Sequence, residues 1–504
     1  MQDGLPLAAI DLGSNSFRLE IGRFDHDGQL QRIQYLKETV RLGGGLDAAG
    51  RISAEAMQRG WDCLARFGER LGDFKPAQVR AVATQTLREA SNRAEFIERG
   101  ARLLGFPIDV VSGPEEARLI YQGVAHLLPP SDERRLVVDV GGRSTELILG
   151  HALVSRSVAS FPVGSVAWSQ RYFPGGRFTA EAFARAEVAA KAVLYEALQV
   201  FSRSAWDVAY GSSGTAGAVG SLGALLGMPT GTITRTGLEA LRNLLLQAKS
   251  VDGLRIEGVK EDRRPVIGGG VAVLRAVFDL LDIDTMQVAQ GALRQGALYD
   301  LLDREHPATD LRAVTVDALA RRFQVDEAQG ARVARVASTL LECLQPRDPA
   351  AEDERYARKL RWAARLHEIG NLIAHGDAHK HGAYILANAD APGFSVPELG
   401  RLSNLVLAQR GKLRKVDEAL NDDGFARQAL CLRLAVALCH ARKDPDLSDL
   451  RLAVAKGSEG WTLGWTSSWE KRHPQSAHLL REEAQAWVKT GRALVLTAGQ
   501  PSGA

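Results

Sequence analysis

A segment near the N-terminus occurs a second time further along the chain. Residues 8–22 (AAIDLGSNSFRLEIG) align without gaps on residues 136–150 (LVVDVGGRSTELILG), so that Asp11 falls on Asp139. Each copy has the pattern of an apolar strand, an aspartate, a turn of small residues and a second apolar strand. Because both copies stand among alternating strand and helix patterns, the repeat predicts a duplicated α/β domain with a cleft between its halves.

Two positions in the first half of the chain carry signals for the start of a helix. Asn92, with Glu95 three residues later, predicts a capping box that opens a helix. Pro114 follows a short apolar strand and suits the first position of a helix that carries Glu115 and Glu116.

The pattern changes after about residue 305. Strand signals fade, long Ala/Leu/Arg-rich helices are expected up to about residue 441, and strand-like runs then return near the C-terminus. At about 150 residues per domain, 504 residues suggest three to four domains. We therefore expect two α/β domains, a helical domain and a small α+β domain, with the bounds 1–125, 126–305, 306–442 and 443–504.

Composition excludes several classes of protein. A net charge of +3 is too small for a dedicated nucleic-acid-binding protein, so no nucleic-acid partner is expected. The four cysteines form no CxxC pair, which argues against zinc ribbons and disulfide frameworks. The chain has neither a basic N-terminal region nor a run of about 18 apolar residues. These features predict a cytoplasmic protein without a membrane span.

The two repeated turns are suited to hold phosphate groups. Small residues let backbone N–H groups approach an anion closely, and hydroxyl groups add donors. An ordinary turn between strands is the alternative for either copy taken alone, but two facing turns would grip neighbouring phosphates of one substrate. The candidate phosphate-binding residues are Asp11, Gly13, Ser14, Asn15 and Ser16 in the first turn, and Gly141, Gly142, Arg143, Ser144 and Thr145 in the second.

Carboxylates near these turns supply candidate metal ligands and a candidate base. Asp11 and Asp139 end their strands, where hard oxygen ligands suit Mg²⁺ between phosphates. Glu146 could add a carboxylate, unless it is merely an exposed strand charge. Glu115 and Glu116 stand in a first helical turn, where acids are often only partners of the helix dipole. The alternative is that a glutamate facing bound phosphates activates water as a general base.

Further clusters of glycine, hydroxyl and arginine side chains follow predicted strands. A third anion-binding loop and a simple strand-to-helix connection are equally compatible with residues 211–217. Arg263 and Arg264 could clamp phosphates, although a solvated basic pair is the commoner outcome. These candidates are Gly211, Ser212, Ser213, Gly214, Thr215, Arg264, Thr84 and Arg88.

Histidines and basic residues gather in the predicted helical domain. His375 and His379 stand four residues apart, and structural roles are favoured over a metal site for these and for His367, which precedes Glu368. The run 410–415 holds four cationic residues and no acid; a solvated face is the default interpretation, and a track for a polyanion is the alternative.

Taken together, the motifs resemble the exopolyphosphatase/guanosine pentaphosphate phosphohydrolase family, within the sugar kinase/actin ATPase superfold. The similarity covers nearly the whole chain, through AAIDLGSNSFRL, ATQTLREASN, SGPEEARLIYQGV, LVVDVGGRSTELILG and ALRQGAL. The resemblance implies two actin-like domains around a cleft, an HD-like helical domain and a homodimer. It implies that Glu116 is the catalytic glutamate, that Asp139 and Glu146 bind Mg²⁺, and that a monovalent cation such as K⁺ is a further candidate cofactor.

One residue departs from the family pattern, in which the third place of the second turn is glycine or alanine. Here it is Arg143, which would either add a phosphate contact or crowd the turn.

Within the family, the segments EAMQRGWDCLARFGERL and HKHGAYIL favour an exopolyphosphatase acting on inorganic polyphosphate. A phosphohydrolase acting on guanosine pentaphosphate (pppGpp) is the alternative. More distant ones are an actin-like kinase or ATPase and a non-catalytic polyphosphate-binding regulator. Peripheral contact with a membrane surface stays open at this stage.

Overall fold

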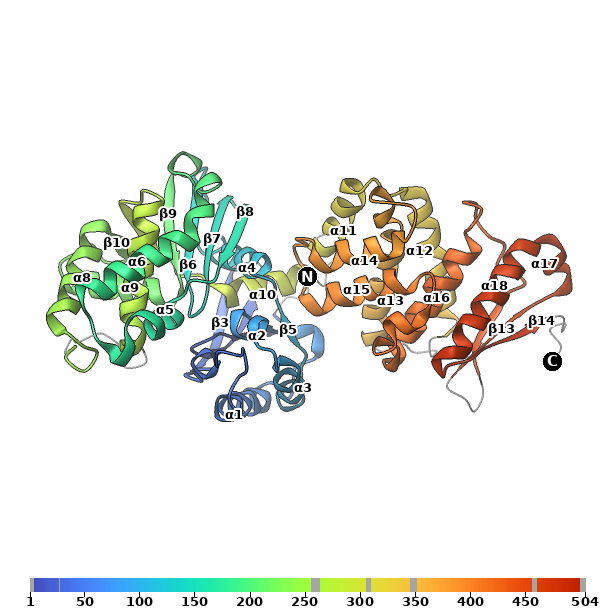
Figure 1. Ribbon diagram of the computed structural model, residues 1–504, viewed down its shortest axis with the longest axis horizontal. Coiled ribbons are helices and arrows are strands. Elements are labelled where there is room, and N and C mark those ends of the chain that lie inside the picture. The colour runs from blue at the N-terminus through green and yellow to red at the C-terminus, as the bar shows by residue number, and fades with distance from the viewer. Residues whose placement is uncertain are drawn as a thin grey trace. The chain divides into compact units, whose positions relative to one another are not determined.

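The computed structural model describes residues 4–26, 28–254, 263–304, 310–344, 351–455 and 460–498. The chain divides into two compact units, Met1–Asp310 (unit 1) and Leu311–Ala504 (unit 2). Figure 1 shows both units, and each is described by itself below.

The sequence repeat forms two equivalent hairpins in unit 1, as predicted. The first joins β1 (Leu7–Leu12) to β2 (Phe17–Phe24), and the second joins β6 (Arg134–Val140) to β7 (Thr145–His151). Each hairpin gains an antiparallel strand on one side and parallel strands on the other. The added strands are β3 (Leu30–Glu38), β4 (Val79–Ala83) and β5 (Ile108–Val110) in one sheet, and β8 (Val154–Phe161), β9 (Val208–Ser212), β11 (Thr285–Val288) and β10 (Thr232–Thr234) in the other.

The resulting strand orders show the duplication directly. The five-stranded sheet runs β3-β2-β1-β4-β5, and the six-stranded sheet repeats that order as β8-β7-β6-β9-β11 before its edge strand β10. Every residue of β4 and nearly every residue of β6 is buried, as expected for strands covered on both faces. Both repeated turns therefore lie at the same relative position, at the end of the first strand of each sheet.

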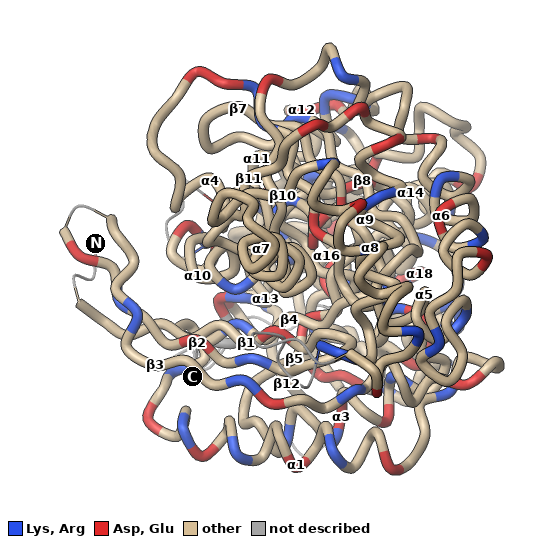
Figure 2. Tube along the Cα trace, turned by 90° about the vertical axis from the view of Figure 1, so that its left-hand side faces the viewer, with Lys and Arg blue, Asp and Glu red and all other residues tan. Residues whose placement is uncertain are grey.

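Helices cover the outer faces of both sheets. Helix α1 (Ala54–Arg70) begins at its cap Ser53 and packs its apolar face with α3 (Arg93–Leu104) in one hydrophobic core. Acidic and basic residues are interspersed along α1 (Figure 2). On the other sheet, the outer helices are α5 (Ser165–Tyr172), α6 (Ala180–Leu194), α7 (Ser213–Leu225), α8 (Arg235–Ala248) and α9 (Ile267–Leu280).

The predicted capping box at Asn92 is wrong. Helix α3 does begin at the next residue, but Asn92 makes no side-chain hydrogen bond to it. Its side chain instead accepts from the backbone N–H of Ile52 and donates to the carbonyl of Ile52, both at 3.0 Å. A distant backbone segment with unpaired groups competes for the same amide, and local sequence spacing does not reveal that competitor.

Two helices lie between the two sheets. Helix α4 (Gly113–Ala125), capped by Ser112 and with Pro114 in its first turn, packs against α10 (Leu293–Arg304). The two helices and inward residues of both sheets share one core, which includes Val82 and Val137. Glycines permit the close approach, because a Cβ on Gly123 would collide with the carbonyl oxygen of Ala292.

We expect Gly123→Ala to destabilise unit 1 by about 2 kcal/mol or more, because the colliding atoms belong to backbone that cannot rotate away. The matched control is Gly217→Ala in α7, where an added Cβ meets no atom within 4 Å. That change should stabilise the protein by about 0.5–1 kcal/mol through helix propensity. Thermal unfolding of both variants measures the difference, and equal melting temperatures would contradict this account of the α4–α10 contact.

Unit 2 combines helices with a small sheet around one hydrophobic core. Its helices are α11 (Leu311–Arg322), α12 (Glu327–Glu342), α13 (Ala351–Arg365), α14 (Ala378–Asn388), α15 (Val396–Ala408), α16 (Asp423–Leu438), α17 (Ser467–Arg472) and α18 (Pro474–Trp487). The sheet contains β12 (Arg451–Val454), β13 (Trp461–Trp465) and β14 (Leu494–Ala498). One hydrophobic core contains buried residues from Val316 to Leu494. Across the described parts of both units, no helix has the length and apolar character needed to cross a membrane.

Candidate active site

The two repeated turns meet in unit 1. A Cβ on Gly142 would lie 2.9 Å from the Cβ of Ser14, and the hydroxyl of Thr86 donates to that of Ser14 at 2.8 Å. Together the turns enclose a cavity of about 90 Å³. Its lining includes these predicted site residues: Asp11, Gly13, Ser14, Asn15, Ser16, Thr84, Glu116, Asp139, Gly141, Gly142, Ser144, Ser213, Gly214 and Thr215.

Other predicted residues lie outside the lining of the cavity. The guanidinium of Arg143 pairs with Glu89 at 2.8 Å, so it joins the second turn to α2 (Gln85–Glu89). Thr145 donates to the carbonyl of Val163 at 2.5 Å. Arg264 does not line the cavity either; its neighbour Arg263 does. Three more predicted residues stand behind the lining: Gly211 and Ser212 within β9, and Glu146 on β7.

The third glycine-rich segment forms the floor of the cavity where β9 passes into α7. Ser213 adopts a left-handed backbone with φ +79°, and its hydroxyl donates to the carbonyl of Val140 at 2.9 Å. A Cβ on Gly214 would collide with the guanidinium of Arg263. Glycine at this position lets Arg263 lie against the loop. Of the two adjacent arginines that the sequence offered, Arg263 lines the cavity.

The two hairpins differ in charge at one equivalent position. Asp11 is opposite Arg18 in the first hairpin, and the Arg18 Nη1 atom donates to Asp11 Oδ2 at 3.0 Å. Asp139 is opposite Glu146 in the second hairpin. One copy of the repeat is thus neutralised internally, whereas the other sets two buried acids on adjacent strands.

The pKa values of this acidic pair reflect that difference. Burial, with the nearby charges of Glu116 and Asp11, raises the pKa of Asp139 to about 7. Burial also raises the pKa of Glu146 well above its ordinary value, with further contributions from Glu116 and Asp139. A cation bound beside two buried, neighbouring acids would stabilise their charged forms. The described residues contain no ready-made group of three or more metal ligands, so a cation held here would take its other ligands from water and substrate oxygens.

Glu116 projects from the first turn of α4 into the cavity. It is 7% exposed, and its Oε2 atom accepts from Arg88 Nη1 at 2.8 Å. Burial raises the pKa of Glu116, Arg88 opposes that shift, and Asp11 adds to it. A buried carboxylate with a raised pKa, fixed by one arginine beside an anion cavity, has the properties of a general base.

Glu115 faces a different environment although it is the next residue. It accepts two hydrogen bonds from Arg118, at 2.8 and 2.9 Å, and lies 3.7 Å from Arg80. Asp300 on α10 pairs with both of these arginines. Of the two glutamates, only Glu116 lines the cavity; Glu115 belongs to a buried ion-pair network that joins α4 to α10 and β4.

Two of the histidines in unit 2 contact protein groups. The Nδ1 atom of His367 lies 2.7 Å from the carbonyl oxygen of Ala364, and His379 Nε2 lies 2.8 Å from Lys415 Nζ. Among the described residues of unit 2, no group of three or more candidate metal ligands is found.

Duplicated sheets of one strand order, with paired turns over a shared cavity, define an actin-like fold followed by a helical domain and a small sheet. Comparison with known families then assigns the chain. The sequence model of the Ppx/GppA phosphatase family matches residues 24–305, and the model of domain III of that family matches residues 311–484. The chain belongs to the Ppx/GppA phosphatase family.

Two relatives that match nearly the whole chain carry the same name. Guanosine-5'-triphosphate,3'-diphosphate pyrophosphatase from Vibrio cholerae is 39% identical over 490 residues, with 96% of each chain covered. The protein of the same name from Vibrio atlanticus is 38% identical over 486 residues, again with 96% of each covered.

Solved structures match a smaller part of the chain. An exopolyphosphatase from Cytophaga hutchinsonii is 25% identical with a TM-score of 0.53, and the match covers 59% of this chain and 98% of that one. The Aquifex aeolicus member of the Ppx/GppA family is 26% identical with a TM-score of 0.51, and the match covers 60% and 99%.

The comparisons confirm the predicted family and shift the expected activity within it. Sequence motifs favoured the exopolyphosphatase branch, but the relatives that match from end to end are named for a guanosine substrate. The segments used to choose the branch lie on α1 and α14, and neither helix lines the cavity between the two turns. These two segments therefore reflect the packing of α1 and the structure of unit 2, and they do not indicate which phosphate compound enters the cavity.

Proposed function

We propose that the protein hydrolyses pppGpp at its terminal 5'-phosphate, releasing inorganic phosphate and ppGpp. The observation that carries this proposal is the small cavity with Glu116 in its lining. At about 90 Å³ it is well below the roughly 300–1,000 Å³ of pockets that enclose drug-sized ligands. A terminal phosphate fits such a space and a nucleoside does not. The names of the two relatives that match nearly the whole chain support guanosine as the part of the substrate that stays outside the cavity.

In the proposed reaction, Glu116 accepts a proton from water as the water oxygen attacks the terminal phosphorus. The bond from that phosphorus to the bridging oxygen breaks, and its electron pair leaves with ppGpp. Backbone N–H groups of the turns at Gly13 and Gly141 bind the phosphate oxygens, because positioning and charge stabilisation supply most of the catalysis in phosphoryl transfer. Asp139 and Glu146 would hold Mg²⁺, which neutralises phosphate charge when it is bound.

The exopolyphosphatase activity is the second candidate, because the same cavity would take the end of a polyphosphate chain. A solved structure of similar fold carries that name. The two candidates differ only in what is attached to the terminal phosphate, so a comparison of substrates separates them.

The purified protein with Mg²⁺ should be given pppGpp, long-chain polyphosphate and ATP separately, at equal concentrations of chain ends. We expect the highest kcat/KM for pppGpp, by about tenfold or more, because a site that binds the guanosine part gains interactions that other substrates lack. Phosphate release is measured together with the identity of the second product. Faster release from polyphosphate would favour the second candidate, and release from ATP alone would contradict both.

A further inference from the structure

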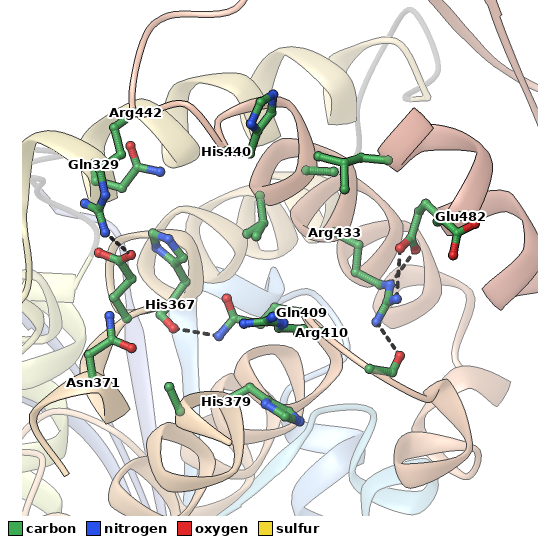
Figure 3. A pocket seen from close by; sticks show the side chains of 17 residues that line it. Gln329, His367, Asn371, His379, Gln409, Arg410, Arg433, His440, Arg442 and Glu482 are labelled. Atoms are coloured by element: carbon green, nitrogen blue, oxygen red, sulfur yellow. Dashed lines mark hydrogen bonds and ion pairs between the residues drawn. The ribbon is translucent and has the colours of Figure 1, made fainter. Parts of the chain in front are cut away.

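A second and larger cavity lies within unit 2 (Figure 3). It has a volume of about 490 Å³, which falls in the range of pockets for small organic ligands. Its lining includes polar side chains from the segments around α14, α15 and α16, among them His367, Gln409 and Arg410. None of these residues belongs to the cavity that contains Glu116.

One end of this pocket carries positive charge that the nearby acids do not neutralise. Arg410 lines the pocket, and no ion pair to it is found among the described residues. His379 lines the same end and accepts a hydrogen bond from Lys415 Nζ at 2.8 Å. Burial lowers the pKa of Lys415, which lies beside the pocket, and Lys380, Arg433 and Lys412 lower it further while Asp377 opposes them, so cations outnumber acids around this group. Such a cluster is suited to an anion, and above all to phosphate.

The remaining charges of the pocket are already paired or lie elsewhere. Arg433 donates to Glu483 at 2.8 Å, and Arg442 lies 2.5 Å from Glu368. Asp377 is occupied by Lys380 at 2.8 Å. Glu482 lies on the opposite side of the pocket from His379 in Figure 3. The end at Arg410 therefore stays available for an anionic ligand.

Another part of the pocket presents neutral hydrogen-bonding groups. The Nδ1 atom of His367 donates to the carbonyl of Ala364, since a carbonyl oxygen can only accept. Burial lowers the pKa of His367, which favours the neutral ring, and in that tautomer the Nε2 atom carries a lone pair. Gln409 uses its NH₂ group on the carbonyl of His367 at 2.6 Å, which leaves its amide oxygen as an acceptor. Asn371 adds a further donor and acceptor. Groups of this kind recognise the edge of a nucleobase.

We propose that this pocket of unit 2 binds a nucleoside phosphate, with the phosphate at Arg410, next to His379, and the base at His367 and Asn371. This site goes beyond the proposed function, because it would take a ligand separate from the one that is hydrolysed.

The first test is isothermal titration of the full chain with GDP. Arg410→Ala should weaken binding about tenfold or more through loss of a charge-assisted hydrogen bond. The matched control is Arg414→Ala, because Arg414 belongs to the same basic run, is exposed and does not line the pocket. It should leave GDP binding within about twofold. Equal binding by the wild type and the Arg410 variant, or no GDP binding at all, would overturn the proposal.

Two further measurements separate the base from the phosphate and this pocket from the catalytic cavity. Asn371→Ala should weaken GDP but not pyrophosphate, and pyrophosphate binding as tightly as GDP would overturn the nucleoside part. Hydrogen exchange with GDP should show protection in residues 367–373 and 409–416. Protection confined to residues 11–16 and 139–145 would place GDP in the catalytic cavity and would likewise overturn the proposal.

Discussion

Replacing Glu116 with glutamine is expected to lower kcat for pppGpp by about 10²-fold or more. Glutamine keeps the size and the hydrogen-bonding capacity of the side chain but cannot accept a proton from water. Because the turns that hold the phosphate are unchanged, the Kd for pppGpp should stay within about threefold of the wild-type value. Steady-state rates and equilibrium binding to the variant measure the two quantities, and unchanged turnover would refute the role of Glu116.

Glu115→Gln is the matched control, since it makes the same chemical change one residue away. Glu115 faces Arg118 and Arg80 instead of the cavity. Loss of this buried charge should lower stability by about 3 kcal/mol, because it leaves Asp300 as the remaining acid for the two arginines. Turnover by the folded fraction should stay close to that of the wild type. A large loss of kcat in folded Glu115→Gln protein would show that the two positions do not divide the roles in this way.

Asp139→Asn should have the second large effect on activity. It removes one of the two buried acids proposed to hold Mg²⁺, so we expect kcat/KM to fall by about 10²-fold and the Mg²⁺ concentration for half-maximal rate to rise. The control is Asp132→Asn, an exposed residue just before the same hairpin. An unchanged Mg²⁺ requirement in the Asp139 variant would contradict the proposed ligand.

The same variant has a second readout that does not depend on activity. The pKa of Asp139 is raised from 3.8 to about 7 in the folded protein, so folding favours its protonated form. Stability is therefore lost as pH rises between these two values and is not recovered above them. We compare the fall in melting temperature between about pH 5 and about pH 8 in the absence of Mg²⁺. This fall should be about 3 °C larger for the wild type than for Asp139→Asn. Parallel melting curves would contradict the raised pKa.

Much of unit 1 could be predicted because its elements follow from local patterns. The repeated hairpins place Asp11 and Asp139 at equivalent strand ends, and the strand–Pro–Glu pattern places Glu116 at the start of α4. In each case the apolar strand or helix start that positions the residue is contiguous with it in sequence. The two turns do meet over one cavity, as the duplication predicted.

The residues that sequence reasoning missed depend on contacts between distant segments. Arg18 neutralises Asp11 across a hairpin, and the gapless alignment could have revealed it, because it aligns Arg18 with Glu146. The sequence singled out Arg263 and Arg264 together but could not show that Arg263, which approaches Gly214, is the one that lines the cavity. Arg143 is directed toward Glu89, which lies on the other sheet's side of the cavity. Such pairings depend on how the two halves pack, and no local pattern encodes that packing.

Hydrolysis of pppGpp in ¹⁸O-labelled water tests the central claim most directly. If water attacks the terminal phosphorus in the cavity beside Glu116, the label appears in the released inorganic phosphate and ppGpp stays unlabelled. Label in ppGpp, or release of pyrophosphate in place of phosphate, would contradict this account of the reaction.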